Sequence, residues 1–292
     1  MSNLLATQRV KRWSIVPMLF VDVVGAAVAI VAAARSGDGW ATVSWTAAFV
    51  AAAALPAQLV AFRWLRVGRT SRNLSVLTAV AVVATITAAV GGVALHSVGT
   101  MVVALIGLTT TQLYARWYTR LSREVRVELS VGAPVPHFEV VDLDGTTVTP
   151  ALFAGQPVVF VFIRGNWCPL CVAQVRELAA DYQLLAAHNV EVALVSPQPL
   201  AETRELAERF DVSFRYLVDP GAAAARQLGI LHEGGVPPGV TQLGYEADTV
   251  FPTVVVVDGN GTIVFSDQTD DYRIRPEPQL FLEALGLPTT AR

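Results

Sequence analysis

The chain has 292 residues, of which 53% are hydrophobic and only 15% are charged. This composition excludes an ordinary soluble protein and predicts that part of the chain lies in a bilayer. The net charge of −3 hides an uneven distribution: residues 1–127 carry twelve Lys or Arg and three acidic residues, whereas the remainder carries nine Arg and twenty-one acidic residues. We therefore expect two different domains, a membrane domain at residues 1–126 and a soluble domain at residues 127–292.

Four apolar stretches in the first part have the length of membrane helices, about 20 residues. They cover residues 13–34, 40–62, 74–95 and 98–117. The first stretch follows three cations, as in a signal peptide, but its apolar run is longer than the usual run of about 7–15 residues. We expect it to be retained, so the sequence predicts an α-helical bundle of four transmembrane helices.

The cations of this part lie almost entirely on one side of the predicted bundle. With four spans, the N-terminus, the second loop and the C-terminal flank share a side, and that side holds eleven of the twelve cations, leaving only Arg35 on the other. The positive-inside rule predicts that this side is the cytoplasm. The expected location is thus the cell (inner) membrane, as a multi-pass protein with its C-terminal domain in the cytoplasm.

Asp22 lies inside the first predicted span, where a carboxylate is a functional candidate by default. The alternatives are that the carboxylate is hydrated near the interface or accepts a hydrogen bond from a hydroxyl of a neighbouring helix. The membrane part contains no cysteine, so it cannot carry electrons across the bilayer by thiol exchange.

A basic connector follows the fourth span. Its four arginines are spaced three or four residues apart, so they would form one stripe on a continuing helix: Arg116, Arg120, Arg123 and Arg126. Anionic lipid headgroups are the expected partner. Nucleic acid is not expected, because the next domain is acidic. Four spans also exceed what a simple anchor needs, which points to docking in a larger membrane complex.

Strand and helix patterns alternate in the second part. Strands are predicted at 138–143, 146–149, 158–163, 190–195, 214–218, 254–257 and 262–265, and helices at 171–187, 200–210, 222–228 and 278–285. A Gly/Pro-rich insertion covers 229–248. This order, with a final hairpin and helix, predicts an α/β thioredoxin-like sheet.

The only two cysteines stand three residues apart, after the apolar run 158–163 and a glycine. A C-x-x-C beside a βαβ pattern is typical of a redox dithiol. The alternatives are a zinc half-site or two inert core thiols, but zinc needs about four ligands and no second ligand pair has the required spacing. We therefore predict a redox centre, with no metal and no cofactor.

The start of the helix predicts different roles for the two thiols. Unpaired N–H groups and the macrodipole favour a thiolate there. Cys168 lies at or just before the first turn and Pro169 at a position where its missing N–H costs nothing. This indicates Cys168 as the attacking thiol and Cys171, one turn inward, as the resolving one.

Longer motifs around the dithiol resemble a known family. They are P-V-P-H-F at 134–138, F-x-R-G-x-W-C-P-x-C at 162–171, F-P-T at 251–253 before a strand and a Gly-Asn-Gly turn, and D-Y-R at 271–273. Together they resemble the peroxiredoxin-like branch of the alkyl hydroperoxide reductase/thiol-specific antioxidant (redoxin) family, over about residues 131–288.

The resemblance implies roles for several residues. Pro252 matches the cis proline that thioredoxin-like folds place opposite the dithiol. The peroxiredoxin motif P-x-x-x-T-x-x-C, set on Cys171, has Cys168 in place of its Thr and Arg164 in place of its Pro, which leaves open which cysteine attacks first. Arg164 and Arg273 are candidates to stabilise a thiolate or bind an anionic substrate, and Trp167 to cap the disulfide or dock a partner.

The sequence thus predicts a membrane-anchored thiol–disulfide oxidoreductase that acts on a disulfide or hydroperoxide and is recycled by an external thiol reductant. The alternatives are a thiol peroxidase that reduces hydroperoxides, or a non-catalytic accessory subunit of a larger membrane complex. The expected site consists of Cys168, Cys171, Pro252, Trp167, Arg164 and Arg273.

Overall fold

The computed structural model describes residues 2–64 and 69–289. The chain divides into two compact units, one of residues 13–120 and the other of residues 121–292 together with residues 1–12. Arg66, one of the cations counted in the second loop, lies outside the described residues.

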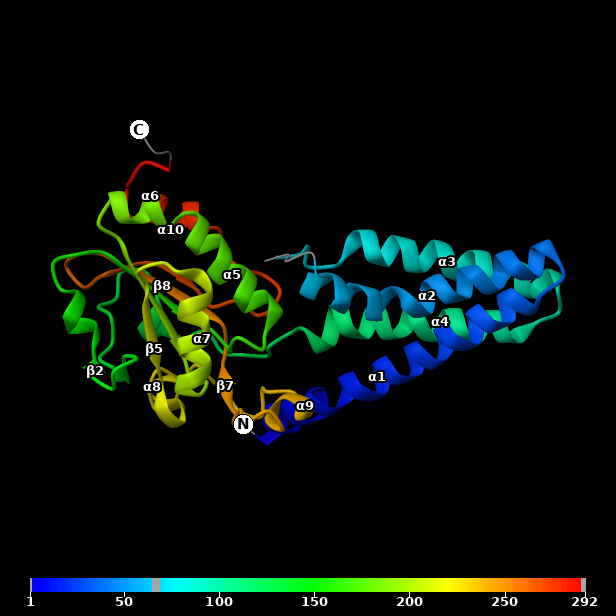
Figure 1. Cartoon of the computed structure of the whole chain (residues 1–292), viewed down its shortest axis with the longest axis horizontal. Coiled ribbons are helices and arrows are strands. Elements are labelled where there is room, and N and C mark those ends of the chain that lie inside the picture. The colour runs from blue at the N-terminus through cyan, green and yellow to red at the C-terminus, as the bar shows by residue number, and fades with distance from the viewer. Residues whose placement is uncertain (1, 65–68, 290–292) are drawn as a thin grey trace. The chain divides into compact units, whose positions relative to one another are not determined.

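The first unit is built from four long helices (Figure 1), α1 (Ser2–Arg35), α2 (Gly39–Trp64), α3 (Ser75–Ala94) and α4 (Val98–Leu113), with a π-helical turn at Tyr114–Tyr118. In the described residues four segments are long and apolar enough to cross a membrane: Val10–Arg35, Gly39–Phe62, Ser75–Ala94 and Val98–Tyr118. The four predicted apolar helices are therefore confirmed.

Small side chains pack inside this bundle and large apolar side chains lie outside. The buried cluster consists of alanines, at positions 29, 48, 51, 84, 88 and 104, whereas Phe20 and Val76 are 67% and 80% exposed. At Gly107 of α4 an added Cβ would lie 2.4 Å from the backbone oxygen of Ala51 in α2. Close helix packing through small residues, with large apolar groups outside, is typical of membrane helix interfaces.

Asp22 is fully buried within this bundle. Its Oδ1 accepts a hydrogen bond of 2.7 Å from the hydroxyl of Thr110 in α4. The structure thus shows one of the alternatives that the sequence left open, a hydrogen bond from a hydroxyl of a neighbouring helix to the Asp22 carboxylate.

The connector is not a continuing helix. Helical structure stops at Tyr118, and only a short 3₁₀ turn at Val127–Leu129 follows before the first strand. Arg123 donates from Nη1 to the carbonyl oxygen of Pro252 at 3.0 Å, and Arg126 donates from Nε to that of Gly229 at 2.9 Å. The predicted single basic stripe is wrong, because two of its arginines satisfy backbone carbonyls of the second unit.

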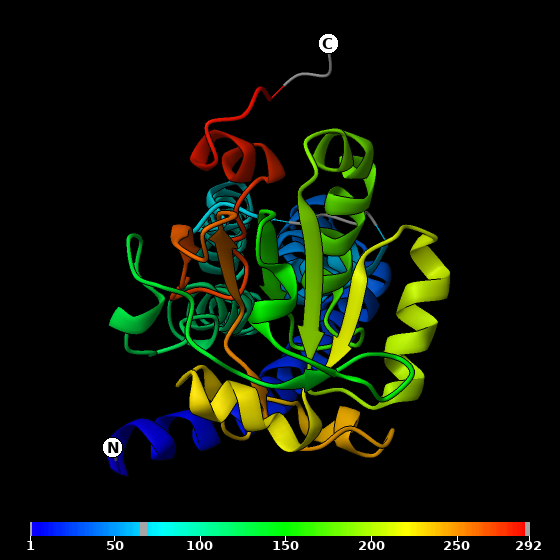
Figure 2. The same cartoon turned by 90° about the vertical axis from the view of Figure 1, so that its left-hand side faces the viewer.

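The second unit contains a seven-stranded sheet of order β2-β1-β5-β4-β3-β8-β9 (Figure 2). Its strands are β1 (Val140–Val141), β2 (Thr147–Val148), β3 (Val158–Phe162), β4 (Glu191–Ser196), β5 (Arg215–Val218), β8 (Thr253–Val257) and β9 (Ile263–Asp267). β3 and β5 flank β4 in parallel, while β8 runs antiparallel to β3. The central strand β3 is buried along its whole length.

Helices cover this sheet: α5 (Pro169–Ala180), α6 (Tyr182–Ala187), α7 (Leu200–Phe210), α8 (Ala223–Gln227) and α10 (Pro278–Ala284). Phe160 and Phe162 point to one face of β3 and pack edge-on against Phe138. Because side chains alternate along a strand, Val159 and Val161 point to the opposite face. All seven predicted strands are present, although β1 and β2 are shorter than predicted.

One predicted helix needs correction, and the insertion has structure of its own. The helix predicted at 171–187 begins two residues earlier, at Pro169, and is broken at Asp181 into α5 and α6. The Gly/Pro-rich insertion at 229–248 contains two short elements, β6 (Leu231–His232) and α9 (Pro238–Thr241). β6 pairs with β7 (Thr249–Val250) to form a second, two-stranded sheet. Strands of two residues are too short to show the alternation of apolar and polar residues from which a strand is predicted.

Candidate active site

The two thiols stand where β3 passes into α5. Cys168 is the N-cap residue of α5, with Pro169 at the first helical position. Gly165 has a φ of 140°, and a Cβ there would lie 2.6 Å from Nε1 of Trp167. The loop can therefore turn tightly only with glycine at this position. β3, which is buried along its whole length, ends at Phe162, so the N-terminus of α5 lies directly after a buried strand.

Both cysteines are free and buried, with Cys168 2% and Cys171 0% exposed. A hydrogen bond from the Cys171 thiol lowers the pKa of Cys168 to about 5, against the effect of burial, with help from the positive charges of Arg164 and Arg275. The same hydrogen bond and burial raise the pKa of Cys171 well above its ordinary value. At neutral pH the stable form is thus a Cys168 thiolate beside a Cys171 thiol.

Arg164 precedes the dithiol loop, and aromatic rings hold its guanidinium. Its Cζ lies 4.7 Å from the ring centroid of Trp167 and 5.3 Å from that of Tyr272. One amino group donates to the carbonyl oxygen of Gly235. This stacking fixes a nearly buried cation next to the thiolate, where it has most effect because water screens it little.

Arg275 is a second cation near Cys168 that the sequence analysis missed. It is 4% exposed, and its only hydrogen bond runs from Nη1 to the carbonyl oxygen of Ile274. One residue, Ile274, separates it from Arg273, which the family motif had indicated instead. No local pattern distinguishes one arginine of this segment from the other, so only the folded loop could identify it.

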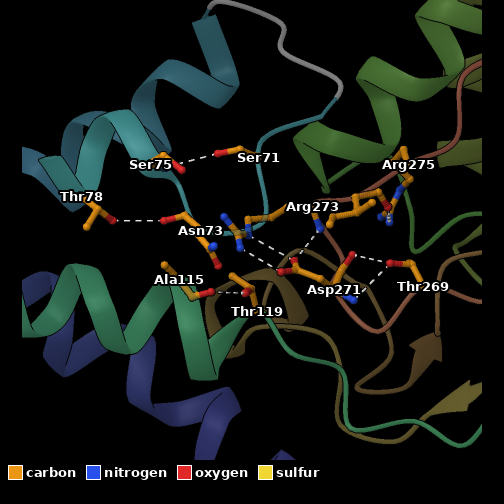
Figure 3. A network of polar contacts seen from close by, with 11 residues as sticks. Ser71, Asn73, Ser75, Thr78, Ala115, Thr119, Thr269, Asp271, Arg273 and Arg275 are labelled. Atoms are coloured by element: carbon orange, nitrogen blue, oxygen red, sulfur yellow. Dashed lines mark hydrogen bonds and ion pairs between the residues drawn. The ribbon is translucent and has the colours of Figure 1, made fainter.

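Arg273 is held in a different environment (Figure 3). Its Nε and Nη2 both donate to the carboxylate of Asp271, at 3.2 and 2.8 Å, and both side chains are fully buried. Thr269 in turn donates to the backbone oxygen of Asp271. Arg164 and Arg273 were both predicted to stabilise a thiolate or bind an anionic substrate. The charges that lower the pKa of Cys168 come from Arg164 and Arg275, whereas Arg273 binds the carboxylate of Asp271 in its own loop.

A polar network fixes the residue in front of the dithiol, Asn166. Its backbone N–H donates to Oε1 of Gln198 at 2.7 Å, and its Nδ2 donates to Oε2 of Glu202 at 2.7 Å. The hydroxyl of Tyr245, from the insertion, contacts Asn166 and also donates to Glu202 at 2.6 Å. The insertion is therefore tied to the active-site loop, a connection that sequence spacing could not indicate.

Comparison with known proteins identifies the domain that carries this site. Residues 131–266 match the model of the AhpC/TSA family. The C-terminal domain belongs to the AhpC/TSA family. Its architecture is the peroxiredoxin/thioredoxin-like α/β fold, as the sequence predicted.

Individual relatives of this AhpC/TSA domain are distant. The chain is 28% identical over 112 residues to peroxiredoxin Q of Oryza sativa, covering 38% of this chain and 52% of the relative. It is 23% identical over 128 residues to thiol-disulfide oxidoreductase ResA of Bacillus thuringiensis, covering 44% and 70%. The chain thus spans about half the length of this rice relative.

Solved structures similar to the chain include BcpB from Mycobacterium tuberculosis, with 19% identity, a TM-score of 0.42 and coverage of 50% of this chain and 90% of that chain. Reduced Prx3 from Vibrio vulnificus has 18% identity and a TM-score of 0.46, with coverage of 53% and 97%.

One expectation drawn from thioredoxin-like folds is wrong for this AhpC/TSA domain. All peptide bonds of the described residues are trans, including the bond before Pro252. Pro252 links β7, which pairs with β6, to β8, which pairs with β3. A trans bond, the form that X–Pro bonds favour, carries the chain from one sheet to the other, and the Pro252 carbonyl accepts from Arg123.

The described residues contain no group of three or more His, Cys, Asp or Glu that could hold a metal ion. The arrangement at the start of α5 supports the chemistry of two sulfurs, with Arg164 and Arg275 as fixed positive charges.

Proposed function

We propose that this protein is a membrane-anchored thiol–disulfide oxidoreductase in which Cys168 attacks and Cys171 resolves. The observation that carries the proposal is the asymmetry of the dithiol: Cys168 is the N-cap residue of α5 with a pKa of about 5, and Cys171 stays a thiol. Only a thiolate is a good nucleophile toward sulfur, so this asymmetry favours one order of attack.

The reaction transfers two electrons from the dithiol to a substrate disulfide. The Cys168 thiolate attacks one substrate sulfur, a mixed disulfide forms, and the other substrate sulfur leaves as a thiolate that takes a proton from solvent. Cys171 then loses its proton and attacks the Cys168 sulfur, which releases the second substrate thiol and leaves a Cys168–Cys171 disulfide. An external thiol reductant restores the dithiol.

Trapping of the mixed disulfide tests this order of attack. The full chain in detergent, carrying Cys171→Ser, should form a stable mixed disulfide with a model disulfide such as 5,5′-dithiobis(2-nitrobenzoate), visible as a mass increase on Cys168. The matched variant Cys168→Ser should form much less, because Cys171 is fully buried one turn inside α5, and burial still raises the pKa of its thiol when Cys168 is absent. Equal trapping by both variants, or greater trapping by Cys168→Ser, would contradict the proposal.

A thiol peroxidase is the second candidate, favoured by the similarity to peroxiredoxin Q. In that reaction the Cys168 thiolate attacks the O–O bond, becomes a sulfenic acid and releases an alcohol or water. Cys171 then condenses with the sulfenic acid to give the disulfide and water. Parallel single-turnover assays of one reduced sample, with hydrogen peroxide and with the model disulfide, distinguish the two reactions by rate.

The membrane location and its sidedness are part of the proposal. Four apolar helices and the bias of cations toward one side support a cytoplasmic domain at 127–292, anchored by residues 1–126. A cysteine introduced at an exposed position of this domain can test the sidedness. In intact spheroplasts a membrane-impermeant maleimide should not label this cysteine, and after lysis it should. A single cysteine placed at exposed Glu139 of the Cys168→Ser/Cys171→Ser chain is a suitable site.

Two further partners belong to this proposal. Exposed Arg116 is the connector residue available to anionic lipid headgroups, since Arg123 and Arg126 bind backbone carbonyls. A larger membrane complex would explain the size of the membrane part. If cells keep the full function when both cysteines are replaced by Ser, the protein is instead an accessory subunit of such a complex.

A further inference from the structure

Arg275 presents unused hydrogen-bond donors beside the reactive thiol. Its Nε and Nη2 are buried without any hydrogen-bond partner, while Nη1 donates to the carbonyl oxygen of Ile274. The side chain is 96% buried, with only 4% exposed. Buried polar groups are nearly always bonded, so a guanidinium that buries two free N–H groups indicates a binding role.

The two free atoms lie on one edge of the guanidinium, the edge that grips a carboxylate in a bidentate pair. The same loop shows this geometry in use. Arg273 donates from Nε and Nη2 to the two carboxylate oxygens of Asp271. Arg275 therefore carries, free and buried, the edge that its neighbour Arg273 uses to bind a carboxylate.

Arg164 adds a second fixed cation with a free donor. It is 8% exposed, its Nε has no hydrogen-bond partner, and the rings of Trp167 and Tyr272 hold its guanidinium in place. The indole N–H of Trp167 is also buried without an acceptor. Every unsatisfied atom among these three residues is a donor, which favours an anion as the missing partner.

Within residues 2–64 and 69–289, no carboxylate is hydrogen-bonded to either of these arginines. Among the described residues neither Arg164 nor Arg275 takes part in an ion pair. Asp267 lies close enough for the positive charges of Arg275 and Arg123 to stabilise its carboxylate, yet it is not hydrogen-bonded to Arg275. In the described part of the chain, the two cations that act on the Cys168 sulfur thus have no carboxylate bound to them, although Asp267 lies near Arg275.

We propose that the Nε–Nη2 edge of Arg275, assisted by Arg164, binds a carboxylate of the substrate, so that the preferred substrates are small disulfides with a carboxylate close to the sulfur–sulfur bond. This inference rests on the proposed thiol–disulfide oxidoreductase function and adds a substrate class to it. The carboxylate is held while the Cys168 thiolate attacks the adjacent sulfur and the mixed disulfide forms. No atom of the carboxylate reacts, and the two electrons still come from the dithiol.

Three model disulfides test the substrate class on the wild-type chain. They have similar backbones but differ in charge: 3,3′-dithiodipropionate carries carboxylates, its dimethyl ester is neutral, and cystamine carries ammonium groups. The reduced full chain in detergent should react with dithiodipropionate about tenfold faster than with the ester, since hydrogen bonds to charged groups are strong. Cystamine should react most slowly, after correction for the rate of each disulfide with a free thiol.

Variants at Arg275 separate substrate binding from activation of the thiol. Arg275→Gln removes the charge and should reduce the rate with dithiodipropionate much more than the rate with the ester. Arg275→Lys keeps a charge but lacks the bidentate edge, so it should recover only part of the preference. Arg215→Gln, at an arginine that is 53% exposed and paired with Glu191, should leave the preference unchanged.

Each outcome decides a different claim. If the wild-type chain reacts equally with the carboxylate and the ester, or prefers cystamine, the carboxylate site is overturned even if Arg275→Gln does not fold. If Arg275→Gln slows both substrates by the same factor, Arg275 acts only on the thiolate and the inference is again wrong. If the wild-type chain reduces none of the three disulfides faster than Cys168→Ser does, the proposed function itself fails.

Discussion

The thiol of Cys171 donates a hydrogen bond to the sulfur of Cys168, one helical turn earlier. This contact divides the dithiol into a thiolate and a thiol before any substrate arrives. The division follows from the position of Cys168 at the N-cap of α5, since a residue three positions later lies above the cap on the first turn. The fixed charges of Arg164 and Arg275 strengthen the same asymmetry.

The pH dependence of alkylation should show this asymmetry. The pKa of Cys168 is lowered to about 5, so its thiolate is favoured in the folded chain. The resulting stabilisation of the folded state is fully present above the ordinary thiol pKa and is lost as the pH falls through about 5. The rate of iodoacetamide modification of Cys168, followed by mass spectrometry, should reach half its plateau near pH 5.

Two substitutions at position 171 identify the cause of the lowered pKa. Cys171→Ala removes the donor and should shift the midpoint of Cys168 alkylation upward. Cys171→Ser keeps a hydroxyl donor and should shift it less. A wild-type midpoint near the ordinary thiol pKa of about 8.5 would show that Cys168 is not activated.

Loss of Arg273 should strongly destabilise the redox domain. Arg273→Leu leaves the carboxylate of Asp271 buried without its bidentate partner, which costs about 3–5 kcal/mol. Because both cysteines lie in this domain, the urea concentration at which Cys171 becomes accessible to alkylation measures its stability. Arg215→Leu removes a pair that is largely exposed and should cost less than about 1 kcal/mol. Similar midpoints for the two variants would contradict a structural role for the Asp271–Arg273 pair.

The hydroxyl of Tyr245 should hold the insertion against the active-site loop. Tyr245→Phe removes its contacts with Asn166 and Glu202 and should cost about 1 kcal/mol. Hydrogen–deuterium exchange of residues 236–248 should become faster. Tyr182→Phe is the matched control, because Tyr182 packs on Phe214 and its hydroxyl has no hydrogen bond among the described residues. Unchanged exchange in Tyr245→Phe would mean that other contacts hold the insertion.

The bundle of four apolar helices should not tolerate a side chain at Gly107. The Cβ of Gly107→Ala would lie 2.4 Å from the Ala51 oxygen and 2.5 Å from the Ala52 nitrogen, so α2 and α4 must move apart. Overpacking of this kind costs about 1–3 kcal/mol and should lower the thermal stability of the detergent-solubilised chain. Gly37→Ala, where nothing lies within 4 Å, should leave the transition in place. Equal transitions for both variants would show that α2 and α4 are not closely packed.

Local patterns determine much of this protein. The run of apolar residues from Val158, followed by Gly165, Cys168 and Pro169, specifies a buried strand, a turn and a helix start within fourteen residues. Helix length and strand alternation are short-range signals, and they recover the four apolar helices and the seven strands. The connector shows where such signals fail, because Arg123 and Arg126 have helical spacing but bind carbonyl oxygens more than 100 residues away.

The sequence by itself determined that an apolar helical part precedes a redox domain and that two thiols open a helix of that domain. Only the tertiary structure decided which charges surround those thiols. Arg275 and Arg273 look alike in the sequence, but the loop that carries them turns Arg273 toward Asp271 and leaves the binding edge of Arg275 free. Side chains from distant loops meet at the end of a central strand because of the order of strands in the sheet, and no local period encodes that order.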